Sequence, residues 1–290
     1  MIKKLLIFFL LFSLTAVEAQ LLWKITGKNL KNPSYIFATS PYISPAYTDS
    51  IPGIFKRFTD CEVVISETAM NKIDHEKKIY NAAILPHNIT LEKFVTNNDK
   101  ELIESEILRI LKLNLKKIST IKPQIIYNLY RDELIKKTLL INTDLDINSF
   151  FQTLASEKGK VVEGVETAEE LISNLSDTTH FQQQADQLIA LMRNNLVFQK
   201  EIIQMSALYK TGNIEKYYNK ALESELAQTK PQSEYLSNIE HKNKKWFAKI
   251  NEVCRSSNAF FVVDIMQLTG EKGLIKLLRT AGYKVDAVGK

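Results

Sequence analysis

The chain of 290 residues lacks the short motifs that identify the common catalytic classes. It contains no Gly-x-Ser-x-Gly elbow, no His-Glu-x-x-His metal motif and no glycine-rich phosphate loop. Its four histidines are scattered, and no two of them have the spacing of metal ligands; they are His75, His87, His180 and His241. Any catalytic site would therefore have to be assembled from residues that are distant in the sequence.

Clusters of positive charge are missing as well. The chain has 38 Lys and Arg residues against 33 Asp and Glu residues, and the two signs are interspersed along it. A nucleic-acid groove needs clustered Lys and Arg together with exposed aromatic side chains. We therefore expect no nucleic-acid partner.

Cysteine is scarce, with only Cys61 and Cys254 present. Each precedes an apolar, strand-like run, so the two thiols could lie at one edge of a sheet and form a disulfide. Alternatively, both are small buried hydrophobic residues. The sequence leaves both interpretations open.

The N-terminal segment is predicted to be an export signal. Positive charge in Met1–Lys4 precedes an apolar run over Leu5–Leu14, which is too short for a bilayer that takes about 20 residues to span. Val17 and Ala19 supply the small residues of a cleavage site, so we interpret residues 1–19 as a signal peptide. An uncleaved anchor is the alternative. No later run reaches transmembrane length, and we expect an exported bacterial protein, periplasmic or secreted.

Six short apolar runs predict strands, and helical spacing dominates the middle of the chain. The strands are expected over 21–26, 34–39, 61–67, 160–165, 260–265 and 283–288. Helices are expected over 47–58, 99–117, 148–158, 177–210, 214–227 and 235–254, with another opened by Pro123. The pattern indicates an α/β (α+β) fold with a central mixed β-sheet, flanking helices and a helical middle or lid. We expect residues 20–290 to form a single domain.

The closing stretch reads as strand, loop, helix and strand. Gly270 and Gly273 mark a turn whose glycines serve backbone geometry, and Gly282 is placed where a helix ends. The loop after such a strand is where α/β proteins usually bind ligands. It carries Asp264, Gln267 and Glu271.

Several segments, in this order, resemble the TraB/GumN family (TraB/PrgY/GumN/Tiki-like). They are LLWKITGKNLKNPSYIFATS, CEVVISE, Lys122-Pro123, GKVVEGVETAEEL, YKTGNIEKYY, HKNKKWFAKI and the closing stretch through GYKV. Each segment is weak alone, but their shared order covers nearly all of the chain after residue 19. The resemblance implies a divalent metal held by two motif histidines and acidic partners, and the hydrolysis of peptide bonds.

The chain departs from this pattern at the metal ligands. The two histidine positions fall on Pro41 and Gln267, and a motif glycine is replaced by Asp264. Proline has no side-chain donor, and an amide oxygen is a poor ligand for a transition metal. We therefore expect no metal and no other cofactor.

Other residues of the pattern remain, and we take Glu67, Glu166, Asn243 and Gln267 as candidate pocket residues. Asp264 is a weak substitute for a metal ligand, and an oxygen-rich site of Asp264, Glu67 and Glu271 would favour Mg, Ca or Mn. The structural alternative is a solvated pair for Asp264 and Glu271, and a role at the helix dipole for Glu166.

These observations lead to three functional hypotheses. The first is a degenerate, non-catalytic member (a pseudoenzyme) that binds a peptide or an envelope partner. The second is a metal-dependent peptidase or hydrolase, using Mn, Co or Zn, with an altered carboxylate site at Glu67, Asp264 and Glu166. The third is a general envelope protein without pocket chemistry.

Overall fold

The computed structural model describes residues 20–69, 76–175, 180–224 and 232–288. The predicted signal peptide, residues 1–19, lies outside them, as do residues 177–179 and 225–227 of two predicted helices. Within the described residues, no helix is both long enough and apolar enough to cross a bilayer.

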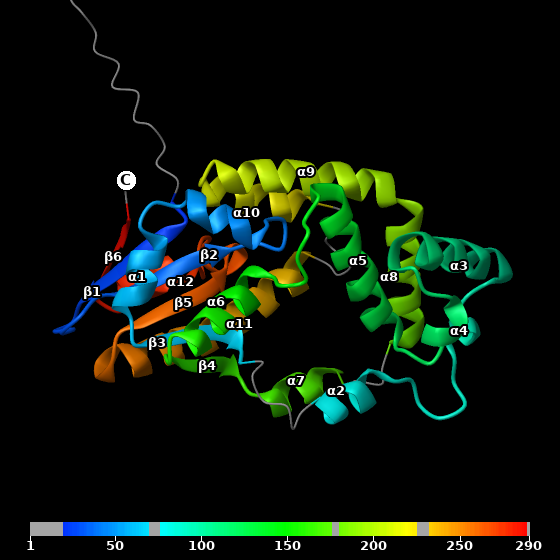
Figure 1. Cartoon of the computed structure of the whole chain (residues 1–290), viewed down its shortest axis with the longest axis horizontal. Helices are drawn as coiled ribbons and strands as arrows, with labels where there is room; N and C mark the ends of the chain where they lie inside the picture. Colours follow the sequence, from blue (N-terminus) through cyan, green and yellow to red (C-terminus); the bar gives the residue numbers. More distant parts are fainter. Residues whose placement is uncertain (1–19, 70–75, 176–179, 225–231, 289–290) are drawn as a thin grey trace, which may run out of the picture.

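The six predicted strands form one mixed sheet (Figure 1). They are β1 (Leu22–Gly27), β2 (Ser34–Thr39), β3 (Val63–Thr68), β4 (Val161–Glu166), β5 (Ala259–Asp264) and β6 (Tyr283–Ala287). Their order is β4-β3-β5-β2-β1-β6. β4, β3, β5 and β2 are parallel, whereas β1 runs antiparallel to β2 and β6. This confirms the predicted fold class and the predicted mixed sheet.

Helices fill most of the remaining described chain. They are η1 (Pro45–Ser50), α1 (Ile54–Asp60), α2 (Glu76–Ala83), η3 (Leu91–Phe94), α3 (Asn97–Leu111), α4 (Leu115–Ile118), α5 (Pro123–Leu139), α6 (Ile147–Glu157), α7 (Ala168–Leu175), α8 (Phe181–Arg193), α9 (Asn195–Lys210), α10 (Ile214–Glu223), α11 (Gln232–Ser256), η4 (Ile265–Gln267) and α12 (Leu274–Thr280).

Three predicted helices are interrupted where the backbone leaves the helical conformation. The helix expected over 47–58 is split because Gly53 adopts a φ of +72°, which glycine tolerates. The helix expected over 99–117 ends at Lys112, which is left-handed, and Asn114 caps a separate α4. The helix expected over 177–210 breaks at Asn194, between α8 and α9. Hydrophobic periodicity continues across all three breaks, so it did not reveal them.

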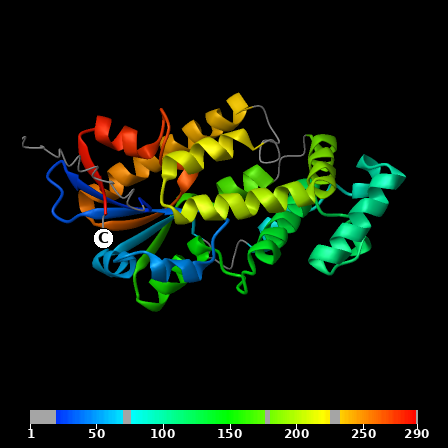
Figure 2. The same cartoon turned by 90° about the horizontal axis from the view of Figure 1, so that it is seen from above.

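The sheet is covered on both faces (Figure 2), which explains its nearly continuous apolar strands. On one face, Phe58 of α1 and Phe151 of α6 pack against Phe260 of β5, with ring centroids 5.6 and 5.1 Å apart. α11 and α12 cover the other face, and Trp246 of α11 is buried in the same core. Cys61 and Cys254 also lie in this core as buried, free thiols.

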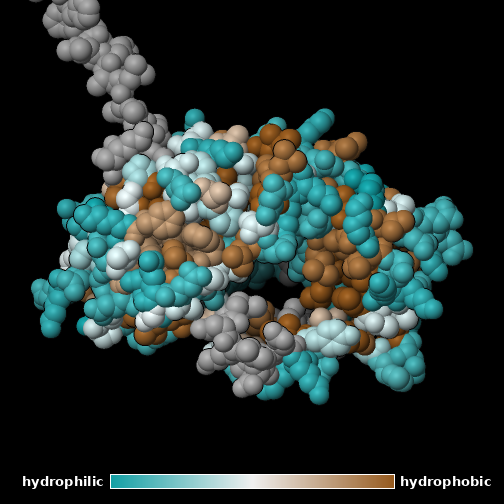
Figure 3. All heavy atoms as spheres, viewed as in Figure 1, coloured by the Kyte–Doolittle hydropathy of each residue, from teal (hydrophilic) through white to brown (hydrophobic). Residues whose placement is uncertain are grey.

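A second apolar core forms within the helical middle of the chain. It is built by α3, α4, α5 and α8 with the first half of α9. α9 joins the two cores, since Phe198 and Ile202 belong to this one and Met205 and Tyr209 to the core of the sheet. Between the two halves the surface is hollowed, and apolar side chains gather there over α5 and α8 (Figure 3).

The glycines of the closing stretch shape its backbone as predicted. Gly270 has a φ of +89° and Gly282, just after α12, a φ of +90°. Gly273 has an ordinary φ of −68°, but a Cβ there would lie 2.4 Å from the carbonyl oxygen of Thr269. The turn between η4 and α12 therefore needs glycine for both reasons, positive φ and close packing.

We predict that Phe260→Ala lowers the free energy of unfolding by about 4 kcal/mol, since it removes a fully buried ring at the centre of an aromatic cluster. Urea unfolding of residues 20–290 measures this change. The matched control is Leu196→Ala on α9, whose residue is 71% exposed. Its effect should stay within about 0.5 kcal/mol, and an equal loss in both variants would contradict the packing described above.

Candidate functional site

The candidate residues gather where the parallel strands end. Thr39 of β2 is the Cα partner of Asp264 of β5, and Thr68 of β3 is the partner of Glu166 of β4. Carboxyl ends of parallel strands share one edge of the sheet, which is the usual place for ligands in α/β proteins. The first and last thirds of the chain therefore meet at this edge.

A cavity of about 460 Å³ lies at this edge, and we call it the edge cavity. Its walls come from the strand ends and from α5, α9, α10 and α11. Pro41 and Gln267, the two positions at which the resemblance places histidines, both line it. Glu67 and Asp264 line it as well.

The four candidate pocket residues take different places around this cavity. Glu67 and Gln267 line it, whereas Asn243 and Glu166 do not. Asn243 is fully buried behind the loop, where its Nδ2 donates to the carbonyl oxygens of Gln267 and Lys272 at 3.0 and 2.8 Å. Glu166 lies at the end of β4, with its carboxylate 3.7 Å from Nζ of Lys245. Their functional roles stay predictions.

α11 places a row of lysines against the acidic strand ends. Lys242, Lys245 and Lys249 are spaced by three and four residues, so they share one helix face. They pair with Glu67, with Glu166 and Glu170, and with Glu163, respectively. Burial lowers the pKa of Lys242, but the charge of Glu67 and its hydrogen bond, together with the charges of Glu166 and Asp264, outweigh burial, and the pKa is raised. Lys242 is therefore protonated at neutral pH, and its charge neutralises that of Glu67.

Asp264 occupies the end of β5 and caps η4. Its Oδ1 accepts a hydrogen bond from the backbone N of Met266 at 2.8 Å. Burial raises the pKa of Asp264 to about 6, and the charge of Glu67 adds to this, against smaller opposing effects from Met266, Lys242 and Arg131. The carboxylate is therefore ionised at neutral pH at an energetic cost to the folded state.

Gln267 ends η4 and is only 5% exposed. Its Oε1 atom is buried and accepts no hydrogen bond from the residues that the structure describes. Oδ1 of Asn243 is also buried and accepts no hydrogen bond from the described residues. Buried acceptors without partners are rare in folded proteins and call for an explanation.

The metal implied by the resemblance does not fit these side chains. Across the described parts of the chain, no three His, Cys, Asp or Glu residues lie close enough to hold an ion. Glu67 is bound by Lys242, and Pro41 offers no ligand. Glu271 is exposed and pairs with Lys276 at 2.6 Å, away from the edge cavity. The oxygen-rich set of Asp264, Glu67 and Glu271 is therefore not brought together.

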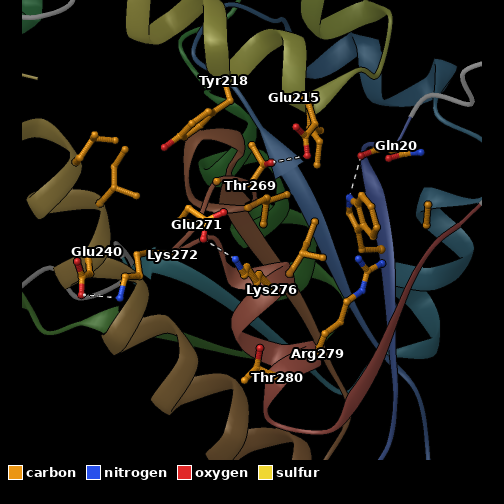
Figure 4. A pocket seen from close by; sticks show the side chains of 18 of the residues that line it. Gln20, Glu215, Tyr218, Glu240, Thr269, Glu271, Lys272, Lys276, Arg279 and Thr280 are labelled. Atoms are coloured by element: carbon orange, nitrogen blue, oxygen red, sulfur yellow. Dashed lines mark hydrogen bonds and ion pairs between the residues drawn. The ribbon is translucent and has the colours of Figure 1, made fainter.

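A second, larger cavity of about 1170 Å³ lies between α10, α11 and α12 (Figure 4). Its polar side chains pair with one another: Oγ1 of Thr269 donates to Glu215 at 3.1 Å, and Lys272 lies 3.8 Å from Glu240. Glu271 and Lys276 of its lining also pair with each other (Figure 4). Because these groups satisfy each other, we assign the candidate site to the edge cavity despite its smaller volume.

Sequence reasoning missed several residues that line the edge cavity. They are Tyr42, Arg131, Glu201, Tyr217 and Tyr235. Tyr217 lies within the YKTGNIEKYY segment, so the resemblance contained a signal for it. The other helical residues reach the cavity only through the packing of α5, α9 and α11 on the strand ends, which periodicity does not specify.

Comparison with known proteins gives one match. The sequence model of a family described as TraB/PrgY/gumN matches residues 21–287. No curated protein and no solved structure matches the chain significantly.

We predict that Asn243→Ala lowers the free energy of unfolding by about 2–4 kcal/mol, because the buried carbonyl oxygen of Gln267 and the partly buried carbonyl oxygen of Lys272 lose their donor, at about 1–3 kcal/mol for the fully buried group and less for the other. Denaturant unfolding measures the loss. Asn238→Ala is the matched control, since Asn238 is exposed on the same helix and gains the same helix propensity. Equal stability of the two variants would show that Asn243 does not hold the loop.

Asp264 should also make stability depend on pH. Its pKa of about 6 in the folded protein exceeds the ordinary value. The folded state therefore binds more protons than the unfolded state between about pH 4 and pH 6, and stability falls as pH rises through this window. Asp264→Asn removes this fall, so it should be more stable than the wild type by about 2 kcal/mol at pH 7.5 and nearly equal at pH 4.

Thermal or urea unfolding across this pH range checks the expectation. Asp49→Asn is the matched control, because Asp49 is exposed and its replacement should leave the curve unchanged. If the wild type instead gained stability relative to Asp264→Asn as the pH rises from 4 to 6, the pKa of Asp264 would be lowered in the folded state, and the prediction would be wrong.

Proposed function

The chain belongs to the TraB/PrgY/gumN family, and from this premise we propose that it is a member without catalytic activity, which binds a peptide or an envelope partner in the edge cavity. The observation that carries the proposal concerns the two histidine positions. Pro41 and Gln267 face the same cavity, as two ligands of one metal would, yet neither supplies an imidazole. The site keeps its place in the fold but lacks the donors for metal-assisted hydrolysis.

The properties of the cavity support binding. A volume of about 460 Å³ lies within the range of small-ligand sites, about 300–1,000 Å³. Apolar side chains such as Met205, Ala221 and Ile239 form part of its wall, and a few polar groups converge on it. A cavity of this kind can take a side chain or a chain end of a peptide.

The location of this activity is part of the proposal. The pattern of residues 1–19 is typical of a signal peptide, so the mature chain would act in the periplasm or outside the cell. A peptide or a protein of the bacterial envelope is then the available partner.

One observation favours a second candidate function, a hydrolase with a carboxylate-based site. The pKa of about 6 for Asp264 lies in the range that suits a general acid or base. Under this alternative Mn, Co or Zn would be required, with Glu67 and Glu166 as further carboxylates. The ion pair of Glu67 with Lys242 argues against it.

A metal and activity assay on purified residues 20–290 separates the two candidates. We expect no stoichiometric metal by elemental analysis, and no cleavage of a peptide library with added Mn, Co or Zn. Stoichiometric metal together with turnover that Glu67→Ala abolishes would replace the binding function by the hydrolase.

Restoring the histidines tests the assignment of positions. The double variant Pro41→His, Gln267→His should gain Co or Zn affinity of at least about tenfold over the wild type, because imidazole suits these ions. Isothermal titration measures the gain. Each single variant is a matched control that supplies one imidazole only and should gain less. A double variant that binds no better than the singles would mean that the two positions do not face one metal site.

A further inference from the structure

We propose that the outer face of α9 binds an anionic lipid surface. This face consists of the exposed residues of the helix, which are Leu196, Val197, Lys200, Ile203, Gln204, Ala207 and Lys210. It goes beyond the binding function proposed for the edge cavity and does not depend on it, because it uses a different surface of the molecule.

α9 carries large apolar side chains on two opposite faces. Its inner face belongs to the two apolar cores. On its outer face Leu196, Val197 and Ile203 are each more than half exposed, and no other helix among the described residues has more than one exposed large apolar side chain. A surface helix of a globular protein normally has polar and charged residues opposite its buried face. The outer face of α9 therefore has the composition of a surface that a partner covers.

The three apolar residues surround a cation. Lys200 follows Leu196 by four positions and Val197 by three, and it precedes Ile203 by three. Residues three and four positions apart are neighbours on the surface of a helix. A lysine among aliphatic side chains buries its methylene stem against apolar groups while its ammonium stays in the polar layer. This arrangement suits the boundary between lipid headgroups and acyl chains.

The outer face is positively charged. α9 is described in full, and none of its exposed residues is acidic. Among the described residues, no carboxylate lies within ion-pair distance of Lys200 or Lys210. The one glutamate in the second half of the helix, Glu201, is turned into the edge cavity, where it accepts a hydrogen bond from Oγ of Ser224 at 2.7 Å. Charge complementarity therefore favours an anionic partner.

The position of α9 suits a flat partner. The helix runs along the top of the molecule in Figure 1 and lies nearest to the viewer in Figure 2. Apolar side chains interrupt the hydrophilic surface along this upper edge in Figure 3. A helix that protrudes in this way can rest on a bilayer without a matching groove, with its apolar side chains in the headgroup and acyl boundary.

A second copy of the chain fits the outer face poorly. A twofold interface uses the same patch on both copies. Such a contact would bring Lys200 and Lys210 close to the same cations of the other copy, and the exposed residues of α9 offer them no carboxylate. An anionic lipid surface supplies the countercharge that a second copy lacks.

Vesicle co-sedimentation of the full chain, expressed with residues 1–19 and purified after export, tests the proposal. The probes are vesicles of phosphatidylglycerol and phosphatidylcholine in equal parts, with vesicles of phosphatidylcholine alone as the uncharged control. We expect the anionic vesicles to bind at least about tenfold more tightly, because each lysine near an anionic surface contributes about fivefold. Mass spectrometry establishes whether residues 1–19 are still attached, and all variants are compared in the same form.

Variants assign the binding to the outer face. Lys200→Gln should weaken it about fivefold, and the double variant Leu196→Gln, Ile203→Gln about tenfold or more, because apolar area leaves the lipid. Lys56→Gln is the control for net charge, since it removes an exposed lysine of α1. Val161→Gln is the control for apolar exposure, since Val161 is more than half exposed on β4, at the opposite side of the molecule (Figure 1). Both controls should bind like the wild type, and urea unfolding confirms that each variant is folded.

A tryptophan on the outer face reports contact with the acyl chains directly. The emission of Leu196→Trp should shift to shorter wavelengths when anionic vesicles are added, whereas that of Val161→Trp should not. The native Trp23 and Trp246 are buried and provide a constant background.

The outcomes that would overturn the proposal are distinct. Equal or absent binding to the two kinds of vesicle would do so, and a loss in Lys56→Gln as large as that in Lys200→Gln would show that net charge, not this face, attracts the protein. A dimer in sedimentation velocity that Ile203→Gln dissociates would make a second copy the partner of the face. None of these results bears on the edge cavity, and metal-dependent turnover that Glu67→Ala abolishes would overturn the function proposed there without affecting the lipid assignment.

Discussion

The parallel pairing of β2 with β5 is the constraint on which the edge cavity depends. It makes Thr39 and Asp264 neighbours although they come from opposite ends of the chain. Side chains alternate along a strand, so a slip of one residue would turn Asp264 to the other face of the sheet. The same slip would move Phe260 out of its buried aromatic cluster, and the loss of this packing opposes the slip. Core packing therefore fixes the position of the polar residues at the strand ends.

α11 supplies the second constraint, through two faces of one helix. The face of α11 that carries Lys242 and Lys249 forms ion pairs with glutamates of β3 and β4. A neighbouring face carries the buried Asn243, which donates hydrogen bonds to η4 and to the loop that follows it. The partly exposed ion pairs contribute little stability individually. The hydrogen bond from Asn243 to the carbonyl oxygen of Gln267 is buried, so it matters more for the position of Gln267. This arrangement connects Asn243 to Gln267 of the edge cavity, although Asn243 itself does not line the cavity.

Much of the fold was predictable because strands are local in sequence. Each strand is a short apolar run bounded by turn residues, and all six were predicted within two residues of their observed starts. The breaks at Lys112 and Asn194 were not, because neither residue type forces a helix to end and the apolar spacing continues across them. Likewise, the resemblance pointed to Pro41, Glu67 and Gln267. Arg131 and Tyr235 reach the cavity only through the packing of distant helices.

Two residues of the edge cavity, Asp264 and Gln267, reduce the stability of the folded protein at the place where the resemblance implies a metal site. Loss of a metal site alone would leave no reason for an acidic residue at Asp264, where the resemblance has glycine. Ionising this half-buried carboxylate reduces stability, and the unpaired, buried amide oxygen of Gln267 does so as well. Groups that reduce stability are typical of functional sites, where ligand binding offsets the loss. On the proposed function, the same two residues that depart from the family pattern line the cavity in which the partner would bind. The departure is then a change of ligand rather than a simple loss of function.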